Sequence, residues 1–113
     1  MEKKSVANAI EYSNERFTKR ILFQKGESTA FVLNFMPGQA LPAHKHPGTE
    51  VYLLVLCGSG TFTINGEDTE VNGNDVVHSS GDEDLAFKNT GTEPVSLYVM
   101  LNKVPDERYV QNI

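Results

Sequence analysis

The chain has 113 residues, of which 39% are hydrophobic and 22% charged, the make-up of one ordinary globular domain. Fifteen acidic residues against ten basic ones give a net charge of −5. This acidic balance argues against nucleic acid or an anionic membrane as a partner and favours a small-molecule ligand. The single cysteine cannot form an internal disulfide, and no apolar segment has the length of a signal peptide or membrane span, so we expect a cytoplasmic protein.

Short strands dominate the predicted secondary structure. Residues 1–15 form an arm that could hold one short helix, and from Phe17 onward apolar and polar residues alternate with the period of a strand. The pair Asn65-Gly66 is typical of a two-residue type I′ hairpin, because both positions need positive φ. The expected strands span residues 17–23, 29–35, 40–46, 50–57, 61–64, 67–71, 75–79, 85–88 and 95–101.

These strands, with turn signals about every ten residues and no long helix, predict an all-β antiparallel sandwich or small barrel. We expect one domain over residues 1–113, made of the arm, a barrel over about 17–103 and a polar tail over 104–113.

The candidate site is a group of two histidines and one acid. In an extended strand His44 and His46 point to the same face, so their imidazoles can meet one cation at about 2.0–2.2 Å. The position of Glu50 depends on the turn at Pro47-Gly48. A tight two-residue loop would set Glu50 opposite Lys45 as a surface ion pair, whereas a longer connection or a corner between sheets would bring it to the histidine face. Pro-Gly suits type I or II turns, which fit tight hairpins poorly, so we prefer the second arrangement.

The same residues carry a family resemblance. The chain reads Gly38, five residues, His44-Lys45-His46, three residues, Glu50, seven residues and Gly58, and this pattern resembles the first motif of the cupin superfamily. The resemblance implies a jelly-roll β-barrel with one divalent metal ion, Fe, Mn, Ni or Zn, on the two histidines and the acid. The family pattern has six residues before the last glycine, so the extra residue implies a β-bulge.

The second family motif is degraded, although the resemblance extends over about residues 30–101. Aligned without gaps, Leu85 stands where the family has its third histidine ligand. Two residues remain as candidates to replace this missing ligand. Asp84 takes that position if the count starts from Gly81, and His78 is a candidate fourth ligand or general base, or else a half-buried strand histidine.

Two functions follow from these observations. A metal held by two histidines and one carboxylate suits non-haem Fe(II), so one expectation is a metal-dependent enzyme acting on a small polar molecule, either a dioxygenase or an isomerase or lyase. Its candidate catalytic residues are His78 and Tyr52, the latter on the parity of Glu50; such a tyrosine is also common in cores. The alternative is a non-catalytic binding or sensor cupin with a weak or empty metal site. Exposed strand edges and the arm predict a homodimer.

Overall fold

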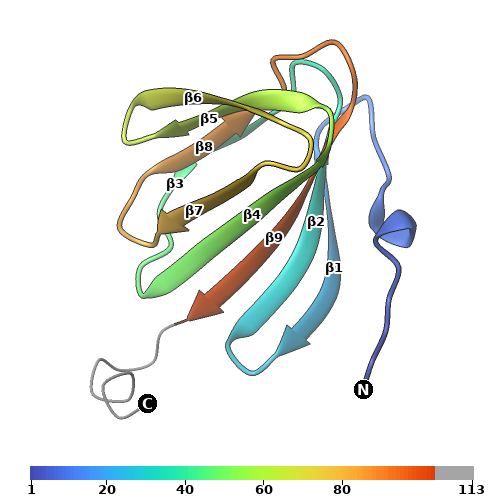
Figure 1. The fold of residues 1–113 in the computed structure, drawn as a ribbon, viewed down its shortest axis with the longest axis vertical. Helices are drawn as coiled ribbons and strands as arrows, with labels where there is room; N and C mark the ends of the chain where they lie inside the picture. Colours follow the sequence, from blue (N-terminus) through green and yellow to red (C-terminus); the bar gives the residue numbers. More distant parts are fainter. Residues whose placement is uncertain (104–113) are drawn as a thin grey trace.

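Nine strands and one short 3₁₀ helix make up the fold in the computed structural model, which describes residues 1–103 (Figure 1). The predicted polar tail lies outside the described residues. No helix within 1–103 combines the length and the apolar character that crossing a membrane requires. The elements are η1 Val6–Ala9, β1 Thr18–Lys25, β2 Ser28–Phe35, β3 Ala40–His44, β4 Thr49–Cys57, β5 Ser59–Ile64, β6 Glu67–Asn72, β7 Val76–Ser80, β8 Leu85–Lys88 and β9 Val95–Lys103.

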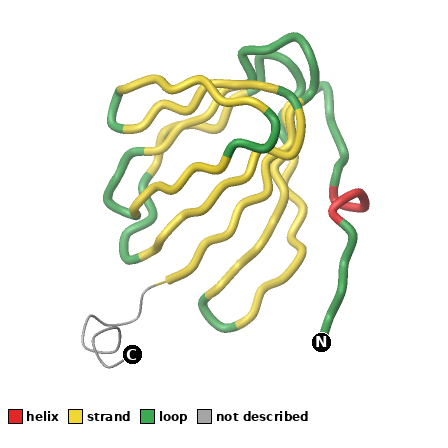
Figure 2. Tube along the Cα trace, in the orientation of Figure 1, coloured by secondary structure: helices red, strands yellow, loops and turns green. Residues whose placement is uncertain are grey.

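The strands form two antiparallel sheets, which confirms the predicted all-β fold. The five-stranded sheet has the order β1-β2-β9-β4-β7 and the four-stranded sheet the order β3-β8-β5-β6. Figure 2 shows that strands fill both layers, that the loops between strands lie at their ends, and that the N-terminal arm runs beside them. Because β3 and β4 belong to different sheets, the chain turns a corner between layers immediately after His44.

Two local predictions are confirmed by the backbone. Asn65 and Gly66 have φ values of 51° and 82°, as a type I′ turn between β5 and β6 requires. In the β4–β9 pair the register shifts between Val55 and Cys57, which is the irregularity that the extra residue in the first motif implied.

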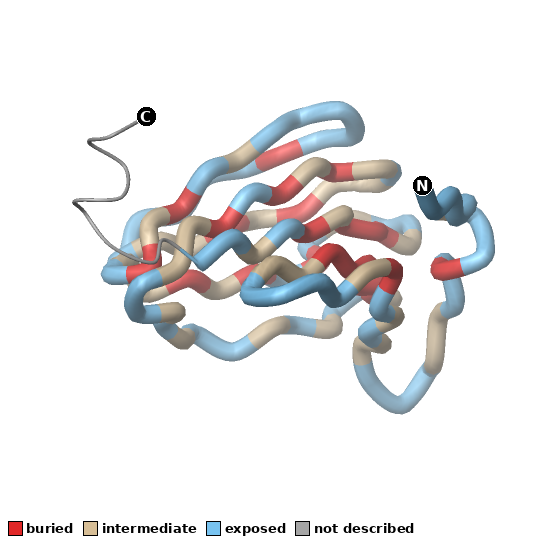
Figure 3. The backbone as a smooth tube through the Cα atoms, turned by 90° about the horizontal axis from the view of Figure 1, so that it is seen from below, coloured by how far each residue is buried: buried red, intermediate tan, exposed pale blue. Residues whose placement is uncertain are grey.

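The core lies between the sheets and follows the period of two along each strand. In β4, Val51, Leu53 and Val55 are buried, whereas the intervening side chains are partly or fully exposed. Figure 3 shows the same alternation of buried and exposed positions along the strands. The core cluster comprises Phe31, Leu33, Phe35, Val51, Leu53, Val55, Phe62, Val71, Leu85, Phe87, Val95, Leu97 and Val99.

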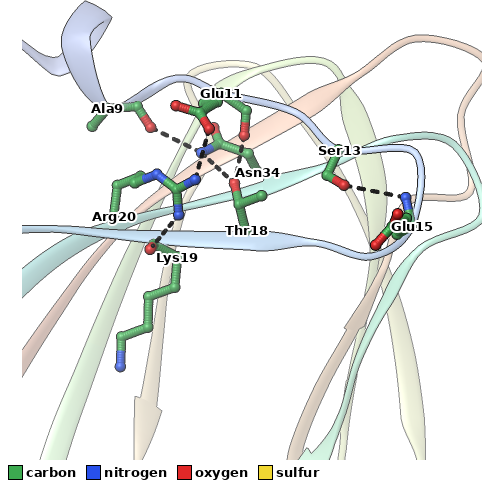
Figure 4. Close-up of polar contacts among 8 residues, drawn as sticks. All are labelled: Ala9, Glu11, Ser13, Glu15, Thr18, Lys19, Arg20 and Asn34. Carbon is green, nitrogen blue, oxygen red and sulfur yellow. Dashed lines mark hydrogen bonds and ion pairs between the residues drawn. The ribbon is translucent and has the colours of Figure 1, made fainter.

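The N-terminal arm packs on the outer face of β1, β2 and β9. Buried Asn34 donates hydrogen bonds to the Ala9 carbonyl at 2.9 Å and to Thr18 Oγ1 at 3.1 Å (Figure 4). The Ser96 hydroxyl donates to Asn34 Oδ1 at 2.7 Å and lies 2.6 Å from the hydroxyl of Tyr12. These bonds satisfy polar groups that would be costly to bury alone, so the arm is part of the folded domain.

Candidate functional site

A pocket of about 190 Å³ lies between the two sheets. Strands of both sheets contribute to its wall, and the wall is apolar except for Lys19, His44 and His46. The volume is below the roughly 300–1,000 Å³ of pockets for drug-sized ligands, so this space suits a smaller molecule. The apolar lining residues are Phe17, Phe31, Leu33, Leu41, Val51, Leu53, Leu85, Val99 and Leu101.

His44 and His46 form a contact pair at this pocket. Their Nε2 atoms lie 3.1 Å apart, and their ring centroids are separated by 4.4 Å in an edge-to-face arrangement. His44 Nδ1 donates to the Pro42 carbonyl at 2.7 Å, because a carbonyl oxygen can only accept. A neutral His44 therefore presents an unprotonated Nε2, which accepts a hydrogen bond from Nε2–H of His46.

Burial favours the neutral form of His46 by lowering the pKa of its imidazole. The charge of Lys19, and that of His44 when it is protonated, lower this pKa further. Lys19 and the histidine pair line the same pocket, so the charge of Lys19 acts on the imidazole of His46.

A tight corner fixes the position of His46. Its N–H donates to the Gly81 carbonyl at 3.0 Å, and its own carbonyl accepts from Thr49 N–H at 3.0 Å. Pro47 and Gly48 are the two central residues of this turn, and Gly48 has a φ of 73°, as the third position of a type II turn requires. A side chain at Gly81 would collide with the His46 and Thr49 carbonyls, so only glycine fits there without movement.

The structure does not bring Glu50 to the histidine pair, so the three predicted ligands are not grouped in it. Glu50 precedes the inward-facing Val51 and therefore points to the outer face of the five-stranded sheet. There its Oε2 lies 2.5 Å from Nε2 of His78. Among residues 1–103, no three side chains of His, Cys, Asp or Glu are grouped closely enough to hold a metal ion.

The burial of β4 explains this outcome. The chain does cross between sheets after His46, as the Pro-Gly argument preferred. However, turning Glu50 inward would shift the parity of the whole strand and expose Val51, Leu53 and Val55. Each buried aliphatic side chain stabilises the fold by about 1.5–3 kcal/mol, and burying an unpaired carboxylate carries a penalty of its own. The aliphatic residues therefore determine which face of β4 packs into the core.

The candidate catalytic residues also lie outside the pocket. Tyr52 is 42% exposed, and its ring centroid is 5.1 Å from that of His78, its partner in the β4–β7 register. We expected Tyr52 to line the cavity and contact a ligand there, but it lies outside the cavity. Tyr52, His78 and Glu50 together form a surface group on the side of the sheet opposite to the pocket.

Neither substitute for the third histidine ligand reaches the histidine pair. Asp84 N–H donates to Asn65 Oδ1 at 2.8 Å, which ties this residue to the β5–β6 hairpin. Leu85 is 2% exposed and is the register partner of His44 in the β3–β8 pair. The position that the ungapped alignment assigns to the third histidine therefore lies beside His44 and carries an apolar side chain.

Sequence reasoning missed Lys19 as a site residue. Lys19 lies on β1 and extends away from the arm, opposite to Thr18 and Arg20 (Figure 4). The signal was present, because Lys19 has the same strand parity as Phe17 and Ile21 and is the only charged residue in that otherwise apolar series.

The residues at the pocket fit a resident metal only in part. Two nitrogens 3.1 Å apart are spaced like two neighbouring ligands of one ion at about 2.1 Å each. Protein-held metal sites use three or four such ligands, and within the described chain a third donor is lacking. The side chains by themselves do not complete the metal centre that the resemblance implied.

Comparisons with known proteins agree with this fold. The family described as "Cupin domain" matches residues 31–101. The oxalate-binding protein of Thermotoga maritima is 29% identical over 65 residues, 58% of this chain and 54% of that protein, so the match spans about half of the relative's length.

Solved structures with lower sequence identity share the architecture. TT1209 from Thermus thermophilus superposes with a TM-score of 0.86 at 22% identity, over 93% of this chain and 100% of that one. A conserved protein with a double-stranded beta-helix domain from Klebsiella pneumoniae gives 0.85 at 21% identity, over 91% and 90%. A predicted oxalate decarboxylase from Thermotoga maritima gives 0.75 at 22%, over 78% and 81%. The family match over most of the barrel, on a fold of two antiparallel sheets, means that the chain belongs to the cupin family.

Proposed function

We propose that this cupin is a small-molecule-binding protein whose ligand lies in the pocket between its two sheets. The observation that carries the proposal is the pocket itself, with an apolar wall and polar groups gathered at Lys19, His44 and His46. A concave apolar site with few polar groups is the usual form of a ligand site. The name of the curated relative, an oxalate-binding protein, agrees with binding as the general role.

Binding is favoured over metal-dependent catalysis by the placement of the side chains. The expected enzyme required a carboxylate beside the two histidines and an acid or base near the substrate. Glu50, Tyr52 and His78 are instead grouped on the outer face of the sheet. The second of the two sequence-based expectations, a non-catalytic binding or sensor cupin, is therefore the one we propose.

A pocket-filling substitution tests this proposal. Leu101 lines the pocket, whereas its neighbour Met100 is 38% exposed on the opposite face of β9. Leu101→Trp should fill the space, and Met100→Trp is the matched control on the same strand. Ligand-observed NMR with small carboxylates, amides, alcohols and amines should find at least one compound that binds the wild type and the control but not Leu101→Trp.

Circular dichroism melting would establish that both tryptophan variants are folded. Compounds that bind Leu101→Trp as well as the wild type would assign the site to another surface. Absence of binding by every compound class would overturn the proposed function.

A second candidate is a metal ion, Fe, Mn, Ni or Zn, held by His44 and His46 with the remaining positions filled by the bound ligand. The Nε2 spacing of 3.1 Å and the hydrogen bond from His44 Nδ1 to Pro42 favour it, because a metal-bound histidine commonly donates its second nitrogen to a carbonyl.

Metal analysis after incubation with each ion tests this candidate. Metal should be lost in His44→Ala and His46→Ala but retained in Glu50→Ala. Equal loss in Glu50→Ala would support the three-ligand set instead, and a wild type free of metal under all conditions would remove the candidate.

A further inference from the structure

We propose that the pocket selects a small monocarboxylate with an apolar body, and that Lys19 binds its carboxylate group. This inference rests on the proposed function and specifies its ligand class. The juxtaposition that carries it is one lysine at the rim of a cavity whose other lining residues are apolar except for the pair His44 and His46.

Lys19 is directed to the pocket by the alternation of β1. Its register partner Leu33 lines the pocket, and its Nζ lies 4.5 Å from the ring centroid of Phe31, another lining residue. Lys19 is itself exposed, so the ammonium lies where the pocket opens to solvent. The long aliphatic stem can pack along the apolar wall while the charge remains at the mouth.

The positive charge at this mouth lacks a compensating acid. The described residues that line the pocket include no Asp or Glu, and Lys19 takes part in none of the ion pairs between described side chains. An anionic ligand group is the complement of this arrangement, and a carboxylate accepting from an ammonium forms a charge-assisted hydrogen bond.

The rest of the wall determines what the remainder of the ligand must be. Beyond the rim, the cavity is bounded by Leu and Val side chains such as Leu33, Leu53 and Val99, which are at most 4% exposed. A carboxylate placed among these aliphatic side chains would be buried without a partner, because the polar lining groups are Lys19, His44 and His46. Oxalate has no apolar part to occupy this aliphatic space, whereas a branched aliphatic or small aryl monocarboxylate fills it.

The residue that determines this specificity, Lys19, lies on β1. The family match begins at residue 31, so the residue that we assign to the carboxylate lies outside the matched segment. The ligand class would then differ from that of relatives that share only the matched barrel segment.

Isothermal titration calorimetry with isovalerate, its neutral amide isovaleramide and oxalate tests the inference. The variants are Lys19→Gln, the charge-conserving Lys19→Arg and the control Lys45→Gln, which removes the same charge from an exposed residue between the two histidines. The wild type should bind isovalerate at least about tenfold more tightly than isovaleramide or oxalate.

The variants distinguish a direct contact between Lys19 and the ligand carboxylate from a long-range effect of positive charge on the protein surface. Lys19→Gln should weaken isovalerate binding about tenfold or more and leave isovaleramide unchanged, because only the carboxylate contacts the ammonium. Lys19→Arg should retain most of the preference, and Lys45→Gln should change affinity less than about threefold.

The inference and the proposed function fail in different ways. If isovaleramide binds as tightly as isovalerate, if oxalate binds more tightly, or if Lys19→Gln has no effect, the pocket is a ligand site but the assigned ligand class is wrong. If none of the three compounds binds, the inference is overturned, and the wider set of compounds tested with Leu101→Trp decides whether the proposed function falls as well.

Discussion

Leu85 determines what chemistry the pocket can support. It is the register partner of His44 across the β3–β8 pair, and both residues line the pocket. Directly paired residues of neighbouring antiparallel strands have Cβ atoms about 4.5–5.5 Å apart, within reach of one shared ion. An imidazole here would add a third nitrogen to the two Nε2 atoms, and the leucine instead closes the wall with a methyl surface.

Leu85→His is therefore expected to strengthen Zn²⁺ or Ni²⁺ binding at least about tenfold, since it supplies the missing donor. The buried polar ring should also lower the free energy of unfolding by about 1–3 kcal/mol. Metal titration checks the first effect, and the double variant Leu85→His/His44→Ala is its control. Unchanged metal affinity in Leu85→His would mean that residue 85 is not directed at the histidine pair.

The sequence predicted which residues of a strand share a face, but it did not predict which of the two faces is buried. Glu50 and Tyr52 do lie on one face of β4, as the period of two requires. Which face that is depends on the layer that covers it. The turn at Pro47-Gly48 allowed either choice, and the decision came from the burial of Val51 and its aliphatic neighbours along the strand. The free energy gained by this burial cannot be predicted from a local sequence pattern, because the burial depends on contacts with strands that are distant in the sequence.

At the scale of elements, turn chemistry made most strands predictable. The strand β8, Leu85–Lys88, has the predicted bounds, and β9 begins at the predicted Val95 but extends two residues further, to Lys103. The Asn65-Gly66 hairpin has its predicted turn type because its geometry is local. The sheet order could not be predicted, because pairs such as β2 with β9 join residues sixty or more positions apart in the sequence.

The corner between β3 and β4 is the element that positions His46, and Gly81 is packed against it. Gly81→Ala should displace the corner, lower the free energy of unfolding by about 1–3 kcal/mol and weaken isovalerate binding, because the new methyl group meets two carbonyl oxygens. Gly73→Ala is the matched control, since its nearest neighbour would be 3.8 Å away, and it should change stability by less than about 0.5 kcal/mol. Thermal unfolding and calorimetry measure both quantities; equal behaviour of the two variants would show that the corner is not constrained.

At the scale of the whole molecule, the outer face of the five-stranded sheet carries exposed apolar side chains. Val76 is 71%, Tyr52 42% and Met100 38% exposed, and Tyr52 and Met100 are register partners in β4 and β9. We propose that the expected homodimer forms across this face, because a two-fold axis would bring the same apolar side chains of two copies together.

Sedimentation equilibrium tests this assembly at micromolar concentration. The wild type should be a dimer and Val76→Lys a monomer, because a charge in the interface would be buried without a partner. Thr69→Lys, on the exposed strand β6 of the other sheet, should remain a dimer. A monomeric wild type, or a dimer that Thr69→Lys disrupts, would contradict the proposed face.

The most direct test of the account is NMR chemical-shift mapping with isovalerate on the isotope-labelled protein. The account predicts that the largest shifts fall on the imidazole signals of His44 and His46 and on the methyl groups of Val51, Leu53 and Val99, all of which border the pocket. Signals of the outer-face group at Glu50, Tyr52 and His78 should change little. Shifts concentrated on that outer-face group, with the inward methyl groups unaffected, would contradict the claim that the ligand lies between the sheets.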